Sequence, residues 1–183
     1  MFGRGRSTHR ALAERADKLG LDEQSLGARA QVDPRRVADA LESDIDLEAT
    51  LSVGEVKRML QVLDLDFLTV FGMPCAFCKQ ADAALAERLT GLRSLPRDEL
   101  IARRREELSL SQDGLLAKLG ITAWYERNAE RTWAQNRMRL WRAVEEAPDA
   151  IDELSLDQVR LLNRVLLLPM HLLVGVRCGA CGR

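Results

Sequence analysis

The sequence predicts an all-α protein in which two tandem, related helical bundles form an intramolecular pseudo-dimer. Apolar residues recur at helical spacing through most of the chain, and glycines and prolines fall at the ends of these segments. Alternating β-branched runs, which are typical of strands, are absent. Residues 51–78 also align without a gap with residues 154–181, at an offset of 103 (154 − 51), and nine of the 28 positions are identical. Such self-similarity indicates a duplication.

The first copy is expected to contain five helices, and its start signals are clear. Asp33 followed by Pro34 is typical of an N-cap and a first helical residue, and Ser52-x-x-Glu55 is typical of a capping box. We expect residues 1–7 to be disordered and the polar residues 42–50 to form a loop. The helices are predicted at about 8–19, 22–30, 33–41, 52–63 and 66–71.

The second copy repeats this plan with one addition. Helices are expected at about 96–108 and 111–119, then after a Thr122 cap, after a Ser155-x-x-Gln158 capping box, and from Pro169 to Gly175. The front halves align at an offset of 89 (110 − 21), so the second copy carries about 14 extra residues (103 − 89) after its third helix. We expect one extra helix there, which bears Trp133, Met138 and Trp141. The domains are then 8–78, a helical linker at 79–95, and 96–181.

Two short helices joined by a tight turn resemble a known DNA-binding motif. Residues 110–115 read LSQDGL and residues 119–122 read LGIT, and this pattern resembles the lambda-repressor-like, or XRE, helix-turn-helix family. Residues 21–26 and 32–37 match it more loosely. The resemblance covers about residues 10–72 and 98–175, and it does not include the cysteine-bearing tails.

The resemblance implies that the third helix of each copy lies in the DNA major groove, while the start of the second contacts phosphates or bases. Two positions depart from the family pattern. Glu23 stands where the second copy has Gln112, and Glu126 stands where the first copy has the apolar Val37. The DNA-facing candidates are Gln24, Arg35, Arg36 and Asp39 in the first copy, and Gln112, Trp124, Tyr125, Arg127, Asn128 and Arg131 in the second.

All four cysteines fall in two Cys-x-x-Cys pairs, one at the end of each copy: Cys75 and Cys78, and Cys178 and Cys181. Zn²⁺ is held by four thiolates in a tetrahedron, so two such turns complete one structural site. The pairs are too far apart in sequence for a local zinc ribbon. We expect each copy to donate one pair to a single zinc ion that joins the two copies. A redox dithiol or disulfide, an iron–sulfur cluster and sites shared within a homodimer remain alternatives.

The other features give weaker indications. His9 lies in a basic N-terminal arm that we expect to be solvated, and the run Arg103-Arg104-Arg105 reads as a solvated helix face. Trp133 and Trp141 are expected to be core or interface anchors, and His171 a packing residue. There is no secretory signal pattern and no apolar run of membrane-spanning length, so we expect a cytoplasmic protein without membrane contacts. No catalytic motif is recognisable, and we expect no enzyme activity.

Together these features favour a sequence-specific, DNA-binding transcriptional regulator with a structural zinc ion. Its two unequal copies would meet two unequal half-sites of double-stranded DNA about one helical turn apart. The net charge of −1, with Glu23 and Glu126, leaves a second interpretation open. The chain would then be a protein-interaction module, anti-activator or antitoxin-like, on a degenerate helix-turn-helix scaffold. The operator, the sign of regulation and the oligomeric state do not follow from the sequence.

Overall fold

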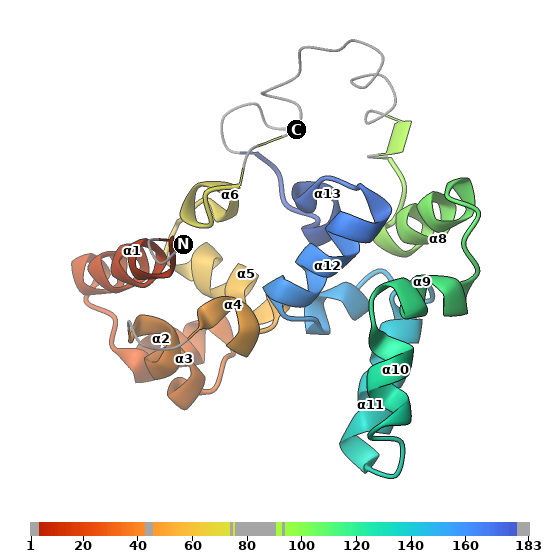
Figure 1. Ribbon diagram of the computed structural model, residues 1–183. Coiled ribbons are helices and arrows are strands. Elements are labelled where there is room, and N and C mark those ends of the chain that lie inside the picture. The colour runs from red at the N-terminus through yellow and green to blue at the C-terminus, as the bar shows by residue number, and fades with distance from the viewer. Residues whose placement is uncertain (1–3, 43–45, 74, 76–90, 93, 179–183) are drawn as a thin grey trace. The chain divides into compact units, whose positions relative to one another are not determined.

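The computed structural model is all-helical over the residues that it describes, which are 4–42, 46–73, 75, 91–92 and 94–178 (Figure 1). This confirms the all-α part of the predicted fold class over these residues. The chain divides into two compact units. The first comprises Met1–Lys79, Ser155–Asp157 and Val176–Arg183, and the second comprises Gln80–Leu154 and Gln158–Gly175. The predicted linker at 79–95 lies mostly outside the described residues.

The first unit is built from α1 (Arg4–Leu19), α2 (Glu23–Ala30), α3 (Pro34–Leu41), α4 (Leu47–Thr50), α5 (Val53–Val62) and α6 (Phe67–Val70), drawn red to yellow in Figure 1. The predicted N-caps of two helices are confirmed. Asp33 accepts a hydrogen bond from the backbone N–H of Arg35, with Pro34 at the first helical position, and Ser52 and Glu55 form a capping box. The apolar faces of these helices meet in one core, which includes Leu12, Leu26, Val37, Met59 and Leu63.

The second unit contains α8 (Arg97–Glu107), α9 (Gln112–Lys118), α10 (Ile121–Glu126), α11 (Thr132–Ala143), η1 (Ala150–Glu153), most of α12 (Leu156–Leu166) and α13 (Met170–Val174). The predicted extra helix is therefore present as α11. Its inner face buries Met138 and Trp141, whereas Trp133 is 48% exposed. Arg97 on α8 donates two hydrogen bonds to Asp152 of η1, which fixes the segment after α11 to the bundle.

The backbone repeats the same turns at the two sequence offsets. Among the described residues, eight have a positive φ, between +52° and +72°. They fall into four equivalent pairs, since two pairs are separated by 89 residues and two by 103. Left-handed residues of this kind end helices and reverse the chain, so the two copies turn at the same places. The pairs are Gly20 and Ser109, Gln31 and Gly120, Asp64 and Leu167, and Gly72 and Gly175.

One side-chain bond is repeated as well. Arg15 on α1 donates from Nε to the backbone oxygen of Leu63 at 2.8 Å, and Arg104 on α8 donates from Nε to that of Leu166 at 2.8 Å. The arginines are 89 residues apart and the leucines 103. Each leucine lies at the C-terminal end of a helix, where backbone carbonyls lack helical partners. The arginine of the first helix of each copy therefore satisfies a backbone carbonyl at the end of α5 in the first copy and of α12 in the second.

Three predictions of local structure were wrong. Residues 4–7 belong to α1 and residues 47–50 form α4, although a disordered start and a loop were expected. The third helix of the second copy does not use Thr122 as its cap. It begins two residues earlier, because its N-cap is Gly120, whose left-handed conformation (φ +72°) already turns the chain into the helix.

Two predictions of solvated charge were also wrong. His9 is 3% exposed, and its Nδ1 lies 2.7 Å from the backbone oxygen of Ala40, so it ties α1 to α3. Arg104 is 9% exposed because it bonds the Leu166 carbonyl. Only Arg103 of the arginine run is exposed as expected. Arg104 and Arg105 thus make contacts within the protein, and the run is not a solvated face.

Candidate functional site

In the first unit, α2 and α3 are two short helices joined by a tight turn. Asp22 caps α2 by accepting a hydrogen bond from the backbone N–H of Ser25 at 2.8 Å, and the Ser25 hydroxyl and amide lower the pKa of Asp22. The chain reverses at Gln31 (φ +55°). The two helices approach closely at Gly27, where an added Cβ would lie 2.8 Å from the backbone oxygen of Val32. The turn therefore depends on a glycine at this position.

The DNA-facing candidates of the first copy differ in their surroundings. Gln24 and Arg35 are exposed, and Asp39 is half-buried. Arg36, by contrast, donates from Nη2 to the Glu55 carboxylate at 2.7 Å. A guanidinium held by a carboxylate of its own unit is less available to a phosphate, so Arg35 is the better candidate for a DNA contact on α3.

The corresponding helices of the second unit, α9 and α10, are arranged more openly. Ser111 caps α9 by accepting from the backbone N–H of Gly114 at 3.0 Å, and the chain reverses at Gly120. However, α10 buries no side chain. Glu126 is exposed at the position where Val37 is fully buried in α3. The third helix of the second copy is therefore not packed into its bundle as α3 is.

The C-terminal end of α11 packs on α8 and α9. Gln112, a predicted DNA contact, donates from Nε2 to the backbone oxygen of Arg142 at 3.3 Å. The Arg142 side chain lies 3.9 Å from Asp113. Arg105 Nε donates to both carboxylate oxygens of Glu145, at 2.8 and 2.9 Å, and this bond is the main cause of the raised pKa of Arg105. The extra helix is thus anchored at its C-terminal end.

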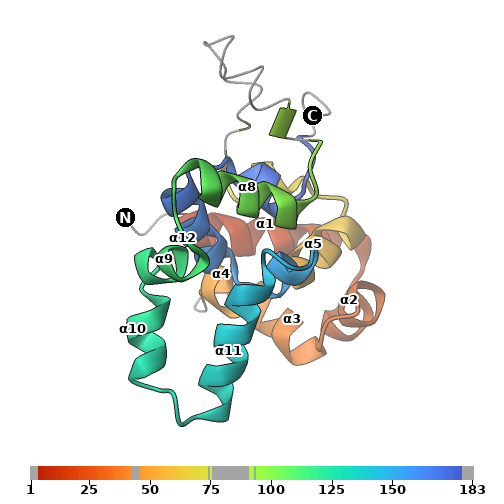
Figure 2. The same ribbon diagram turned by 90° about the vertical axis from the view of Figure 1, so that its right-hand side faces the viewer.

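α10 and α11 form a hairpin in which the two helices lie side by side (Figure 2). The rings of Trp124 and Trp133 meet edge to face, with centroids 5.2 Å apart. The Arg137 guanidinium lies 5.3 Å from the Trp124 ring, and that of Arg131 lies 5.7 Å from the Trp133 ring. Asn128 donates to the Trp124 carbonyl at 2.8 Å and so satisfies the end of α10. The tryptophans thus hold two arginines in place at the surface.

The α10–α11 hairpin is strongly basic. Residues 121–143 contain five arginines and two glutamates, a net charge of +3 (5 − 2), whereas the whole chain has −1, which leaves −4 for the remainder. All five arginines are exposed, and Tyr125 is half-buried. A basic element on an otherwise acidic protein suits a polyanionic partner. The arginines are Arg127, Arg131, Arg137, Arg139 and Arg142.

Two of the four predicted zinc ligands can be placed. Cys75 and Cys178 stand at equivalent positions of the two copies, are 6% and 7% exposed, and both belong to the first unit. Cys78 and Cys181 lie outside the described residues. Among the described residues no group of three or more histidine, cysteine or acidic side chains could hold a metal ion. The two placed thiols therefore supply half of the predicted set.

The comparisons with known proteins return nothing. No family model matches the chain, and neither a curated protein nor a solved structure matches it. None of the helices over the described residues combines the length and the apolar character that crossing a membrane requires.

Sequence reasoning missed three residues of the hairpin surface. Arg137 and Arg139 were not among the candidates, and neither was Trp133, which was expected to be a core or interface anchor. The signal was present, because both arginines follow Trp133 at positions four and six along a helix that also buries Met138. Arginines that flank a buried residue can be recognised as exposed only once the buried face of the helix is known.

Proposed function

We propose that this protein is a sequence-specific regulator that binds double-stranded DNA through the α10–α11 hairpin and the exposed side of α3. The observation that carries the proposal is the concentration of five exposed arginines within 23 residues, on a chain whose remaining residues are net acidic. Arginine is the residue most suited to bidentate bonds with phosphate oxygens and with guanine edges.

The two regions would have different tasks. The hairpin arginines suit the phosphate backbone, because phosphate contacts fix position and provide most of the affinity. Trp124 and Trp133 support this role by holding Arg137 and Arg131 in place, which lowers the conformational entropy lost on binding. On α3, the exposed Arg35 is the candidate for a base contact. Since the two copies present different side chains, we expect an imperfect palindrome.

We further propose that one zinc ion joins the tails of the two copies. The burial of both Cys75 and Cys178, and their membership of one compact unit, support this arrangement. Within the same unit an isolated antiparallel bridge pairs Ser52 with Ser155, which are equivalent residues that each directly precede a helix. Thiolates at all four cysteines would give zinc a tetrahedral shell, and its binding energy would stabilise the fold.

The DNA proposal is tested by fluorescence anisotropy with a labelled duplex at 50 and 200 mM salt. We expect affinity to fall steeply with salt, because each neutralised phosphate contributes about 0.9 to the slope of log affinity against log salt concentration. Replacing two exposed hairpin residues, Arg127→Gln with Arg139→Gln, should reduce that slope by about 1.8 and the affinity by roughly tenfold.

The matched control is Arg10→Gln with Arg103→Gln, which makes the same change of charge at exposed arginines outside the hairpin. This control should leave binding nearly unchanged. Equal losses of DNA affinity in both double variants would mean that the overall charge of the protein, and not the position of the arginines, causes the effect. No binding to any duplex at 50 mM salt would overturn the proposal. An operator selected from random duplexes should then lose affinity with Arg35→Ala.

A further inference from the structure

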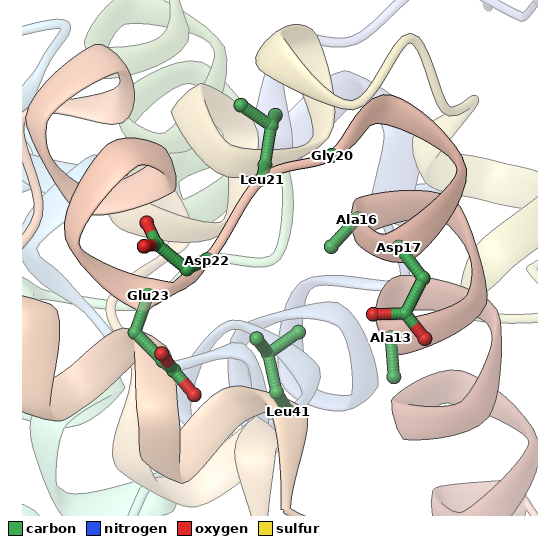
Figure 3. Close-up of a pocket in the computed structure, with 8 residues that line it drawn as sticks. All are labelled: Ala13, Ala16, Asp17, Gly20, Leu21, Asp22, Glu23 and Leu41. Carbon is green, nitrogen blue, oxygen red and sulfur yellow. The ribbon is translucent and has the colours of Figure 1, made fainter.

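The first unit contains an open pocket of about 510 Å³ where α1, the start of α2 and the end of α3 meet (Figure 3). Its apolar wall is made by Ala13, Ala16, Leu21 and Leu41. Three carboxylates surround the opening: Asp17 on α1 and, across from it, Asp22 and Glu23. An apolar cavity with an acidic rim suits a side chain that has an aliphatic stem and a cationic head.

The second copy shows what covers the same place in its own bundle. At the offset of 89, Ala16 corresponds to Arg105 and Glu23 to Gln112. Arg105 bonds Glu145, and Gln112 bonds the Arg142 carbonyl, so the end of α11 covers this position in the second unit. The first copy lacks the 14 extra residues that provide α11. In the second copy this position therefore binds the end of an additional helix, and the first copy has no equivalent of that helix.

The residue exchange also indicates the chemistry of the missing occupant. In the second unit the Arg105 side chain fills the space, and its Nη1 donates to the Leu110 carbonyl at 2.7 Å. In the first unit Ala16 leaves that space empty, and the pocket wall keeps Leu21, the equivalent of Leu110. Glu23 replaces the neutral Gln112. A cationic side chain brought from outside would occupy the volume of Arg105 and meet Asp22 and Glu23, whose equivalents in the second copy are the neutral Ser111 and Gln112.

We propose that this pocket binds an arginine-bearing helical segment of a partner protein, which covers α1 and α2 as α11 covers α8 and α9. The arginine would enter beside Ala16, with its guanidinium near Glu23 and Asp17. Asp22 would contribute as a fixed negative charge, because its N-cap bonds with Ser25 keep it ionised. This inference is independent of DNA binding, since none of these residues lies on the hairpin or is a candidate DNA contact.

The test uses the full chain and an alanine-based helical peptide of 15 residues with a central arginine and two flanking lysines. The reference peptide has glutamine at all three positions. We expect saturable binding of the basic peptide by fluorescence anisotropy, and shifts of the Ala13 and Ala16 methyl signals in NMR spectra. Ala16→Arg, which introduces the residue of the second copy, and Glu23→Gln should each weaken binding at least tenfold.

Two control variants make the same chemical changes outside the pocket. Ala28→Arg adds an arginine at an exposed position of α2, and Glu42→Gln removes an exposed carboxylate just after α3. Both should bind the basic peptide like the unaltered chain, with unchanged helical circular dichroism. Equal losses in controls and pocket variants, equal binding of the glutamine peptide, or no binding at millimolar peptide would each overturn the proposal. A dimer in sedimentation that Ala16→Arg converts to a monomer would assign the pocket to a second copy instead.

Discussion

The two copies keep the same backbone turns and the same arginine-to-carbonyl bond, yet they differ wherever the second and third helices meet. The first copy has Gly27 at this contact, whereas the second has the buried Leu116. The first buries Val37, whereas the second exposes Glu126. The long helices and their ends therefore define the bundle in both copies. The contact between the second and third helices is the part that differs, and in the second copy the extra helix α11 packs where this contact is open.

The largest expected effect on stability comes from replacing Gly27 of the first copy with leucine, the residue at the equivalent position 116 of the second copy. Gly27→Leu should lower the free energy of unfolding by about 3 kcal/mol, because even its Cβ would lie 2.8 Å from the Val32 backbone oxygen. Urea denaturation followed by circular dichroism measures this change. Ala28→Leu, on the exposed side of the same helix, should be nearly neutral. A tolerated leucine at position 27 would show that the first turn is as open as the second.

A smaller effect is expected for the shared arginine bond. Arg104→Gln should cost about 2 kcal/mol, because Arg104 is buried and its loss leaves the Leu166 carbonyl without this donor. Arg15→Gln should cost less, since the Arg15 side chain is 33% exposed and water can replace it. Urea midpoints of the two variants compare the copies directly, with the exposed Arg103→Gln as the control. Equal costs, or a larger cost at Arg15, would contradict the account.

The smallest effect concerns pH. Asp22 caps α2 with a carboxylate, whereas Ser111 caps α9 with a hydroxyl. Since the pKa of Asp22 is lowered in the folded state, its contribution is present above the ordinary aspartate pKa and is lost as the pH falls through the lowered value. Asp22→Ser should therefore make stability slightly less dependent on pH below about 4. Urea midpoints at pH 7 and pH 3 measure this. An unchanged pH dependence would mean that Asp22 has no such role.

Local signals in the sequence predicted much of the fold. The Asp33-Pro34 pair and the Ser52 capping box predicted helix starts correctly, because caps depend on neighbouring residues only. The predictions failed where a distant group decides. Arg104 reads as solvated until the Leu166 carbonyl, 62 residues away, is placed beside it. The pocket at Ala16 cannot be predicted from the sequence either. It is recognised only when Ala16 is compared with its equivalent in the second copy, Arg105, and with the contacts that Arg105 makes there.

The relation between the copies also rests on their tails, where four thiolates are proposed to share one ion. Native mass spectrometry of the purified chain, before and after a strong chelator, tests this most directly. We expect one zinc ion on each single chain, its loss with the chelator, and its absence in Cys78→Ser and Cys181→Ser alike. A metal-free chain with four reduced thiols, or a zinc ion that survives in either variant, would contradict a site built from both copies.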